Sequence, residues 1–232
     1  MVESLDQACA IINVWKQELR STVEPLSKNL AFKPTFEADY YHEAIVYRFI
    51  ELFESAQILY KKQLFVGAAL SARGTIETLA ILWFLNEKLR MVTKTEDFRS
   101  FSSQLERLRF GFTGDPKLPE RINILNAIDA VDKALDGNLR RFYNILSEYA
   151  HPNFSGTLGA YASVNKETME VSLSFAKAET KPIKENVERA IILSAGIFEN
   201  IKEAYDQVIN DVLRLSKRLH DQGKLRGMLD KD

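Results

Sequence analysis

The stretch from Gln63 to Asn86 is long and apolar, and its only charged side chains are Arg73 and Glu77. Four residues separate them, so on a helix they lie one turn apart on the same face. Two interpretations stay open. The pair is a buried structural ion pair, or Arg73 serves an anionic ligand or a developing phosphate charge while Glu77 holds it. Because an arginine before a glutamate is the weaker order on a helix, we expect partners on other helices.

A second set of polar residues lies on one face of a helix predicted to run from Leu139 to about Ala150. It consists of Arg140, Asn144, Ser147 and His151, spaced by four, three and four residues. Asparagine and serine are poor helix formers, so their presence within this helix indicates that their side chains make specific hydrogen bonds. His151 ends the helix before Pro152, where it would act either as an acid or base near neutral pH or as a cap on nearby backbone.

One element of the sequence resembles a known superfamily. Tyr143-Asn-Ile-Leu-Ser-Glu-Tyr-Ala-His-Pro-Asn153, together with Ala72-Arg-Gly-Thr-Ile-Glu77, is similar to uncharacterised bacterial helical proteins within the HEPN-like superfamily. The resemblance covers about residues 40 to 155, and Leu-Ser-Glu-x-x-His-Pro is its most recognisable part. It implies a helical bundle, frequent homodimers and, in many members, metal-independent RNA cleavage or nucleotide binding in toxin, phage-defence or RNA-processing systems.

The chain departs from the pattern of the nuclease members in one respect. Those members carry an arginine and a histidine on one helix with four to six residues between them. Here His151 follows Arg141 with nine intervening residues and Arg140 with ten. The departure argues against ribonuclease activity unless Arg73, from the adjacent helix, supplies the missing cation.

Two functional hypotheses follow. In the first, the protein is an RNA- or nucleotide-acting effector of a bacterial defence or toxin system, with His151, Arg73 and Glu77 in catalysis and Arg140, Asn144 and Ser147 in ligand binding. In the second, the same residues form a structural hydrogen-bond network in a dimeric binding or scaffold module without catalysis. Neither hypothesis requires a cofactor.

Composition excludes several classes of protein. The 232 residues include 46% hydrophobic ones and carry a net charge of −1, which argues against disorder and against electrostatic coating of nucleic acid. A single cysteine and three scattered histidines exclude disulfide scaffolds and predict no metal site. The N-terminus lacks the pattern of a secretory signal, and Arg73 and Glu77 would be costly in lipid. We therefore predict a cytoplasmic protein with no membrane partner.

Apolar periodicity predicts an all-α, HEPN-like multi-helix bundle forming a single domain over residues 1–220, with a flexible tail at 221–232. The expected helices cover residues 5–19, 39–62, 63–90, 94–109, 122–135, 139–150 and 184–219, with Asp136-Gly137 as a helix stop. Residues 25–37 and 111–119 carry prolines and are expected to be loops. Met169, Val171, Leu173 and Phe175 alternate with polar residues, which predicts a small β-hairpin insertion near 157–176. A lone hairpin is marginally stable, so we expect it to need cover, and we expect a homodimer.

Overall fold

Helices dominate the computed structural model, which describes residues 2–25, 29–135, 138–175 and 181–225. The helices are α1 (Leu5–Gln17), α2 (Lys33–Lys61), α3 (Phe65–Thr95), α4 (Phe98–Phe110), α5 (Ile124–Leu135), α6 (Leu139–Ala150), the short α7 (Leu158–Tyr161) and α8 (Lys181–Asp221), with a 3₁₀ turn at Leu30–Phe32. Strands β1 (Ala162–Val164) and β2 (Val171–Leu173) form an antiparallel hairpin. The structure confirms the all-α bundle, the small hairpin and the long C-terminal helix.

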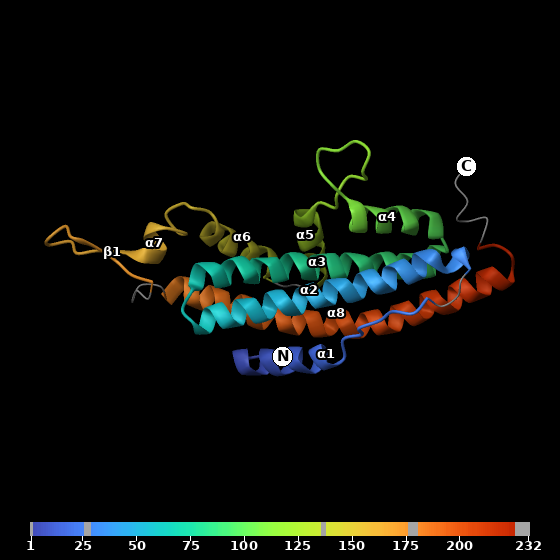
Figure 1. Ribbon diagram of the computed structural model, residues 1–232, viewed down its shortest axis with the longest axis horizontal. Coiled ribbons are helices and arrows are strands. Elements are labelled where there is room, and N and C mark those ends of the chain that lie inside the picture. Colours follow the sequence, from blue (N-terminus) through green and yellow to red (C-terminus); the bar gives the residue numbers. More distant parts are fainter. Residues whose placement is uncertain (1, 26–28, 136–137, 176–180, 226–232) are drawn as a thin grey trace.

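Three long helices, α2, α3 and α8, run side by side along the length of the molecule (Figure 1). Helix α1 packs on α8 along one side, and α4, α5 and α6 pack against α3 on the other. Two apolar clusters lie along this frame, one centred on Phe49 and Phe198 and the other on Leu89 and Val212. Both clusters draw residues from the same three helices, so these helices tie the two halves of the bundle together.

Two glycines let α2 and α3 approach closely. A Cβ atom on Gly67 would lie 3.3 Å from Leu59 Cδ1, and one on Gly74 would lie 3.2 Å from Leu52 Cδ1. Larger residues would force these leucines aside. These two contacts fix the register of the antiparallel helices. Each step forward along α3 is matched by one step back along α2.

Two helices begin earlier than the periodicity predicts. Helix α2 starts at Lys33 rather than near residue 39, so the prediction of a loop over 25–37 was wrong for its last five residues. Helix α8 starts at Lys181 rather than 184. Pro34 and Pro182 each lie in a first helical turn, where proline costs no hydrogen bond because those N–H groups have no partner in the helix.

The C-terminal end of α8 turns back on the bundle. Gly223 has a φ of 69°, a left-handed conformation that favours glycine, and its N–H donates to the carbonyl of His220. This turn returns Leu225 to the second apolar cluster, where it is fully buried. The first residues of the predicted flexible tail therefore end α8 and pack on it, while 226–232 lie outside the described residues, as does the predicted helix stop at 136–137.

Helix α3 is long and apolar enough, by length and composition, to cross a membrane, and it is the one such helix in the described ranges. Within its most apolar window, 56% of the residues are buried inside the protein. Central helices of soluble bundles meet the same criteria.

His42 is buried on α2 with no hydrogen bond to either ring nitrogen from the described residues, and it stacks on Tyr205 with ring centroids 3.3 Å apart. Burial lowers the pKa of His42 well below 6.5, and the positive charges of Lys202 and Arg20 lower it further. The folded protein therefore keeps this ring neutral at a pH where the unfolded chain protonates it.

Acidification is expected to destabilise the protein through His42. As the pH falls below about 6.5, only the unfolded chain takes up this proton, and the free energy of unfolding falls by up to about 1.4 kcal/mol per pH unit. Urea titrations from about pH 7.5 to 5 measure this slope, and the difference between wild type and His42→Phe, which keeps a ring against Tyr205, isolates it. Equal slopes in the two proteins would contradict the assignment.

Candidate anion-binding cavity

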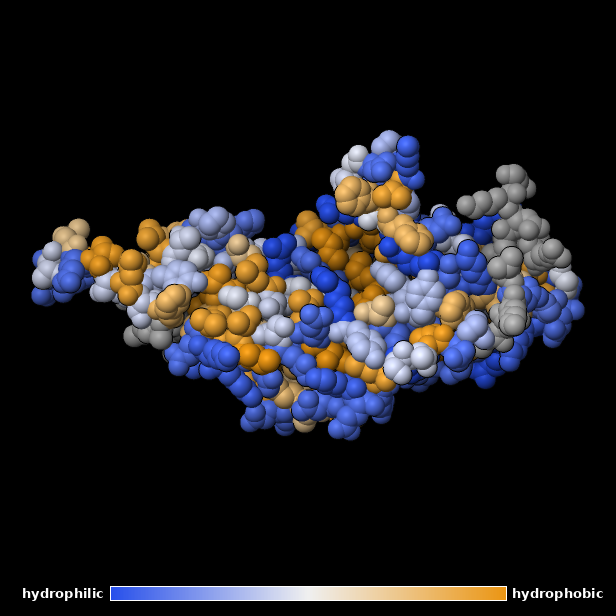
Figure 2. All heavy atoms as spheres, viewed as in Figure 1, coloured by the Kyte–Doolittle hydropathy of each residue, from blue (hydrophilic) through white to orange (hydrophobic). Residues whose placement is uncertain are grey.

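A cavity of about 860 Å³ opens between α2, α3 and the segment that joins α4 to α5. On the face shown in Figure 2, hydrophobic residues lie at the bottom of a hollow beside this segment, and hydrophilic residues flank it. Its apolar wall consists of Ile45, Ile81, Ile122, Ile124 and Leu125, and its polar lining of Tyr41, Arg48, Arg73, Glu77, Thr78, Thr113, Glu120, Arg121, Asn123 and Tyr143. The volume is that of a small-molecule site.

The register of α2 and α3 brings the first two walls together. Because Leu52 faces Gly74, the next turn of each helix places Arg48 beside Thr78, and the turn beyond places Ile45 beside Ile81. Thr78 is buried and donates its hydroxyl to the carbonyl of Gly74. The glycine contact between the helices thus also sets the position of a cavity arginine.

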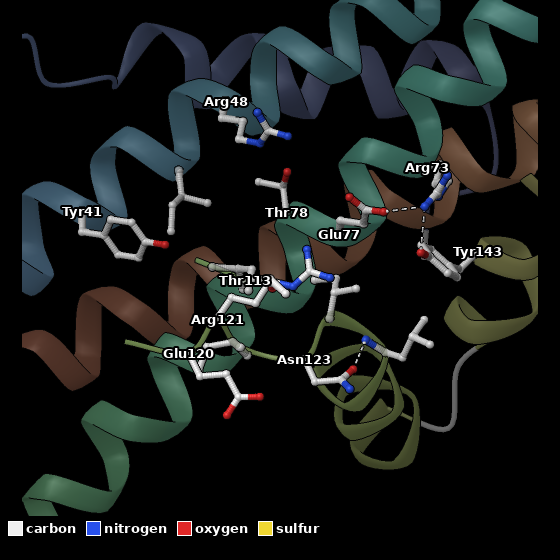
Figure 3. Close-up of a pocket in the computed structure, with 15 residues that line it drawn as sticks. Tyr41, Arg48, Arg73, Glu77, Thr78, Thr113, Glu120, Arg121, Asn123 and Tyr143 are labelled. Atoms are coloured by element: carbon white, nitrogen blue, oxygen red, sulfur yellow. Dashed lines mark hydrogen bonds and ion pairs between the residues drawn. The ribbon is translucent and has the colours of Figure 1, made fainter. Parts of the chain in front are cut away.

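Arg73 lies at one end of the cavity and is held from two sides (Figure 3). Its Nη2 atom lies 3.2 Å from Glu77 Oε1 and donates a hydrogen bond of 3.0 Å to the hydroxyl of Tyr143 on α6. The guanidinium also lies over the Tyr143 ring, 5.0 Å from its centroid. The partner on another helix that the Arg-before-Glu order predicts is thus Tyr143.

The Arg73 side chain is 29% exposed and the Glu77 side chain is 31% exposed. They are therefore neither sealed in the core nor fully solvated. The Arg73 Nε atom is buried without a hydrogen-bond partner among the described residues, so the network leaves one donor unsatisfied. The pair is thus a structural ion pair that also forms part of the cavity wall, and binding of an anion by Arg73 stays a prediction.

Two further arginines enter the cavity from separate elements. Figure 3 shows Arg48 of α2 and Arg121 of the α4–α5 segment pointing from opposite sides toward Glu77 and Thr78, while the carboxylate of Glu120 points away. Within the described residues, neither Arg48 nor Arg121 has an ion pair or a side-chain hydrogen bond. Both guanidinium groups are exposed and available to a ligand.

The α4–α5 segment is closed at its base, and this closure sets the position of Arg121. The N–H of Phe112 donates to the carbonyl of Pro119, and Arg107 Nε donates to the carbonyl of Glu120, each over 3.0 Å. Gly111 lies at the narrowest point: a Cβ there would be 2.6 Å from Arg121 Cα and 2.2 Å from the Arg107 carbonyl oxygen. Only glycine permits the two ends of the segment to approach this closely.

Tyr41 lines the cavity as a neutral phenol. Its hydroxyl donates to the carbonyl of Leu108 over 2.7 Å, which ties α2 to α4. Burial raises the pKa of Tyr41 to about 12, although the nearby charges of Arg109 and Arg48 oppose the shift. The cavity therefore keeps its positive charges next to an uncharged tyrosine at neutral pH.

The polar stripe of α6 lies away from this cavity. Arg140 forms an ion pair of 2.8 Å with Asp129 and so connects α6 to α5. Ser147 donates to the carbonyl of Tyr143, one turn earlier, and Asn144 is exposed without a side-chain hydrogen bond in the described structure. The structure thus brings Arg73 and Glu77 together in the wall of the cavity. The lining does not include Arg140, Asn144, Ser147 or His151.

His151 ends α6 at an exposed position. Its backbone N–H donates to the Ser147 carbonyl, and its ring makes no hydrogen bond with the described residues. The polar residues around it act locally: Asn153 donates to Glu148 over 2.8 Å and accepts from the N–H of Gly156. These contacts shape the turn after α6, at the end of the string that runs from Tyr143 to Asn153. A catalytic role for His151 stays a prediction.

Sequence reasoning missed three of the residues that build the cavity. Arg48 has the spacing of an outward-facing residue on α2, Tyr143 has the spacing of a core residue on α6, and Arg121 lies just after the loop predicted at 111–119. One signal was available: Tyr143 begins the string on which the resemblance depends. No group of three or more histidine, cysteine, aspartate and glutamate residues gathers to hold a metal ion in the described ranges.

Comparisons with known proteins give no further guide to the site. No family model, no curated protein and no solved structure matches the chain. The HEPN-like resemblance therefore remains a prediction from the residues quoted above.

Proposed function

We propose that the cavity binds a nucleotide, free or at the end of an RNA strand. The observation that carries the proposal is that Arg48 and Arg121 reach one cavity from separate elements without an internal partner among the described residues, beside the partly satisfied Arg73. Guanidinium groups bind phosphate oxygens through paired hydrogen bonds. Three of them around one space favour a ligand with one or more phosphate groups.

The remaining lining suits the rest of a nucleotide. The isoleucines and Leu125 offer an apolar surface for a base, and Tyr41 adds an aromatic side chain. Glu77, held in place by Arg73, offers a carboxylate that accepts hydrogen bonds from a sugar hydroxyl or a base amino group. The resemblance to the HEPN-like superfamily, whose members act on RNA or bind nucleotides, supports the same ligand class.

The cavity is proposed to bind a nucleotide, and RNA cleavage stays a separate hypothesis. The residues that line the cavity include no histidine, since His42 is buried in the core, His151 ends α6 and His220 lies near the end of α8. Of the two carboxylates in the described lining, Glu77 points into the space near the arginines and Glu120 points away (Figure 3). The ion pair of Glu77 with Arg73 suits a positioning role.

Calorimetric titration tests the proposal with ligands that differ in one group each. We expect a nucleoside 5′-monophosphate to bind at least about tenfold more tightly than the nucleoside, and added salt to weaken the binding. Inorganic phosphate measures the contribution of the anion alone. A short RNA with and without a 5′-phosphate distinguishes a strand end from a free nucleotide. Equal affinity for nucleoside and nucleotide, or no binding by any of these probes, would overturn the proposal.

Gly111→Ala is expected to weaken nucleotide binding about tenfold, because a Cβ at this position pushes against Arg121 Cα and displaces the arginine from the cavity. Calorimetry measures the dissociation constant. Gly159→Ala is a matched control, since a Cβ there would also be close to backbone, 3.0 Å from the Phe154 carbonyl oxygen, but lies outside the cavity lining. An unchanged affinity in Gly111→Ala would show that the closed base does not position Arg121.

A further inference from the structure

The charged side chains that enter the cavity do not cancel, and the excess of positive charge has a definite size. Arg73 and Glu77 form an ion pair of 3.2 Å and neutralise each other. Arg48 and Arg121 have no ion-pair partner among the described residues, so each adds one positive charge. Glu120 belongs to the lining, but its exposed carboxylate points away from the space (Figure 3). The cavity therefore holds two uncompensated positive charges.

The other groups at the cavity leave this charge balance unchanged at neutral pH. Tyr41 stays a neutral phenol, because burial raises its pKa to about 12. Arg109, whose positive charge reaches Tyr41, forms an ion pair of 2.7 Å with Glu37. The rest of the described lining consists of apolar, hydroxyl and amide side chains. The charge that a ligand meets is therefore set by Arg48 and Arg121.

The carboxylate of Glu77 is fixed beside these two arginines. Arg73 holds it by the ion pair, and Arg73 in turn donates a hydrogen bond of 3.0 Å to the Tyr143 hydroxyl. Arg48 and Arg121 point toward Glu77 from opposite sides (Figure 3). An anion bound by both arginines therefore lies near a negative charge of the protein. Like charges placed close together in a partly desolvated site repel each other.

We propose that the cavity selects a terminal phosphate monoester, the end group of a nucleoside monophosphate, over phosphate groups of higher or lower charge. The selection rests on the proposed nucleotide site and specifies its ligand. A phosphate monoester carries about −1.5 to −2 charges near pH 7, which two free guanidinium groups neutralise. A phosphodiester inside a strand has one negative charge and leaves one arginine uncompensated. A diphosphate or triphosphate brings further negative charge, which Glu77 repels.

Glu77 is the specificity-determining residue of this proposal. Its oxygens accept hydrogen bonds from a ribose hydroxyl, which is a neutral donor. They repel a second phosphate, whose oxygens at neutral pH are negatively charged acceptors. Without this carboxylate, Arg48, Arg73 and Arg121 would present three positive charges to the cavity, which match the charge of a diphosphate. The choice between one and two phosphates thus depends on a single side chain.

Calorimetry with adenosine 5′-monophosphate, diphosphate and triphosphate tests the selection at about pH 8, where the monoester is dianionic. The buffer contains EDTA, because divalent cations would offset the additional charge. We expect the monophosphate to bind at least about threefold more tightly than the diphosphate or triphosphate. We also expect it to bind about tenfold more tightly than its methyl ester, which has a similar shape and one negative charge.

The outcomes separate the selection from the nucleotide site itself. A diphosphate or a methyl ester that binds as tightly as the monophosphate would overturn the selection and leave nucleotide binding intact. No binding by any of the four ligands would overturn the nucleotide site, and the selection with it.

Glu77→Gln tests the role of the carboxylate. The amide has the same size, and its oxygen still accepts from Arg73, so we expect the affinity for diphosphate relative to monophosphate to rise at least about tenfold. Glu120→Gln is the matched control, because it removes the same charge from a lining residue whose carboxylate points away (Figure 3). It is expected to change the ratio by less than about twofold.

The ratio compares two ligands on the same protein, so a partial loss of folded protein in either variant does not alter it. An unchanged ratio in Glu77→Gln, or an equal change in Glu120→Gln, would overturn the role of Glu77.

Discussion

Replacement of Phe198 by alanine is expected to lower the free energy of unfolding by about 3 to 5 kcal/mol. Phe198 on α8 is fully buried, stacks on Phe49 of α2 with centroids 4.2 Å apart, and meets the edge of Trp15 from α1 at 6.3 Å. The truncation would remove the ring that joins three helices and leave a cavity at the centre of the first apolar cluster. Guanidinium titration monitored by circular dichroism measures the loss as a lower midpoint with an unchanged slope.

Two variants show whether the loss comes from this packing. Phe198→Leu keeps most of the apolar volume and is expected to cost less than about half as much as the alanine variant. Phe154→Ala removes the same number of atoms at a position that is 72% exposed, and it is expected to change stability by less than about 1 kcal/mol. A loss below about 1 kcal/mol for Phe198→Ala would show that α8 does not depend on this contact.

The core around Phe198 could be predicted from the sequence because periodicity carries the information. Phe49 and Phe198 both lie on the apolar faces expected for their helices, and both are buried. Helix ends were less predictable. Helix α3 runs to Thr95, five residues past its expected end, because no glycine or proline stops it before Glu96 adopts a left-handed φ of 59° and Asp97 caps α4 through the Ser100 N–H.

The cavity was only partly predictable, for a geometric reason. Successive residues on a helix point about 100° apart, so Tyr143 faces α3 while its neighbour Asn144 faces solvent. The polar stripe therefore lies on a different side of α6 from Tyr143, the residue that reaches the cavity, and its role in ligand binding stays a prediction. The pair on α3 could be found because charge is rare in that stretch, and its outside partner could be expected from the order of Arg73 and Glu77.

Arg121 illustrates what the sequence cannot reveal locally. Its position depends on contacts between residues far apart in the segment, such as the hydrogen bond from Arg107 to the Glu120 carbonyl. The 111–119 region was expected to be a loop, and that expectation holds. Turn residues indicate where a loop occurs. Contacts between residues distant in sequence determine which of the loop's side chains lies in a cavity.

Replacement of both Arg48 and Arg121 by alanine is expected to weaken nucleotide binding by about 10²- to 10⁴-fold. Each guanidinium would contribute roughly 1.5 to 3 kcal/mol through charge-assisted hydrogen bonds to phosphate. Both side chains are exposed and lack an ion-pair partner among the described residues, so the double variant should fold as stably as wild type within about 1 kcal/mol. Calorimetry gives the affinity, and thermal melting checks the fold.

The single variants and a charge-matched double variant show where the energy comes from. If Arg48 and Arg121 contact the same phosphate, the double variant loses more than the two single losses combined, because in each single variant the remaining arginine partly compensates for the one removed. Arg214→Ala with Arg218→Ala removes the same net charge from the far end of α8, at positions 77% and 57% exposed, and is expected to leave binding within about twofold. Equal weakening in this control would mean that the effect arises from overall charge, whereas full binding by the Arg48 and Arg121 double variant would exclude the cavity as the nucleotide site.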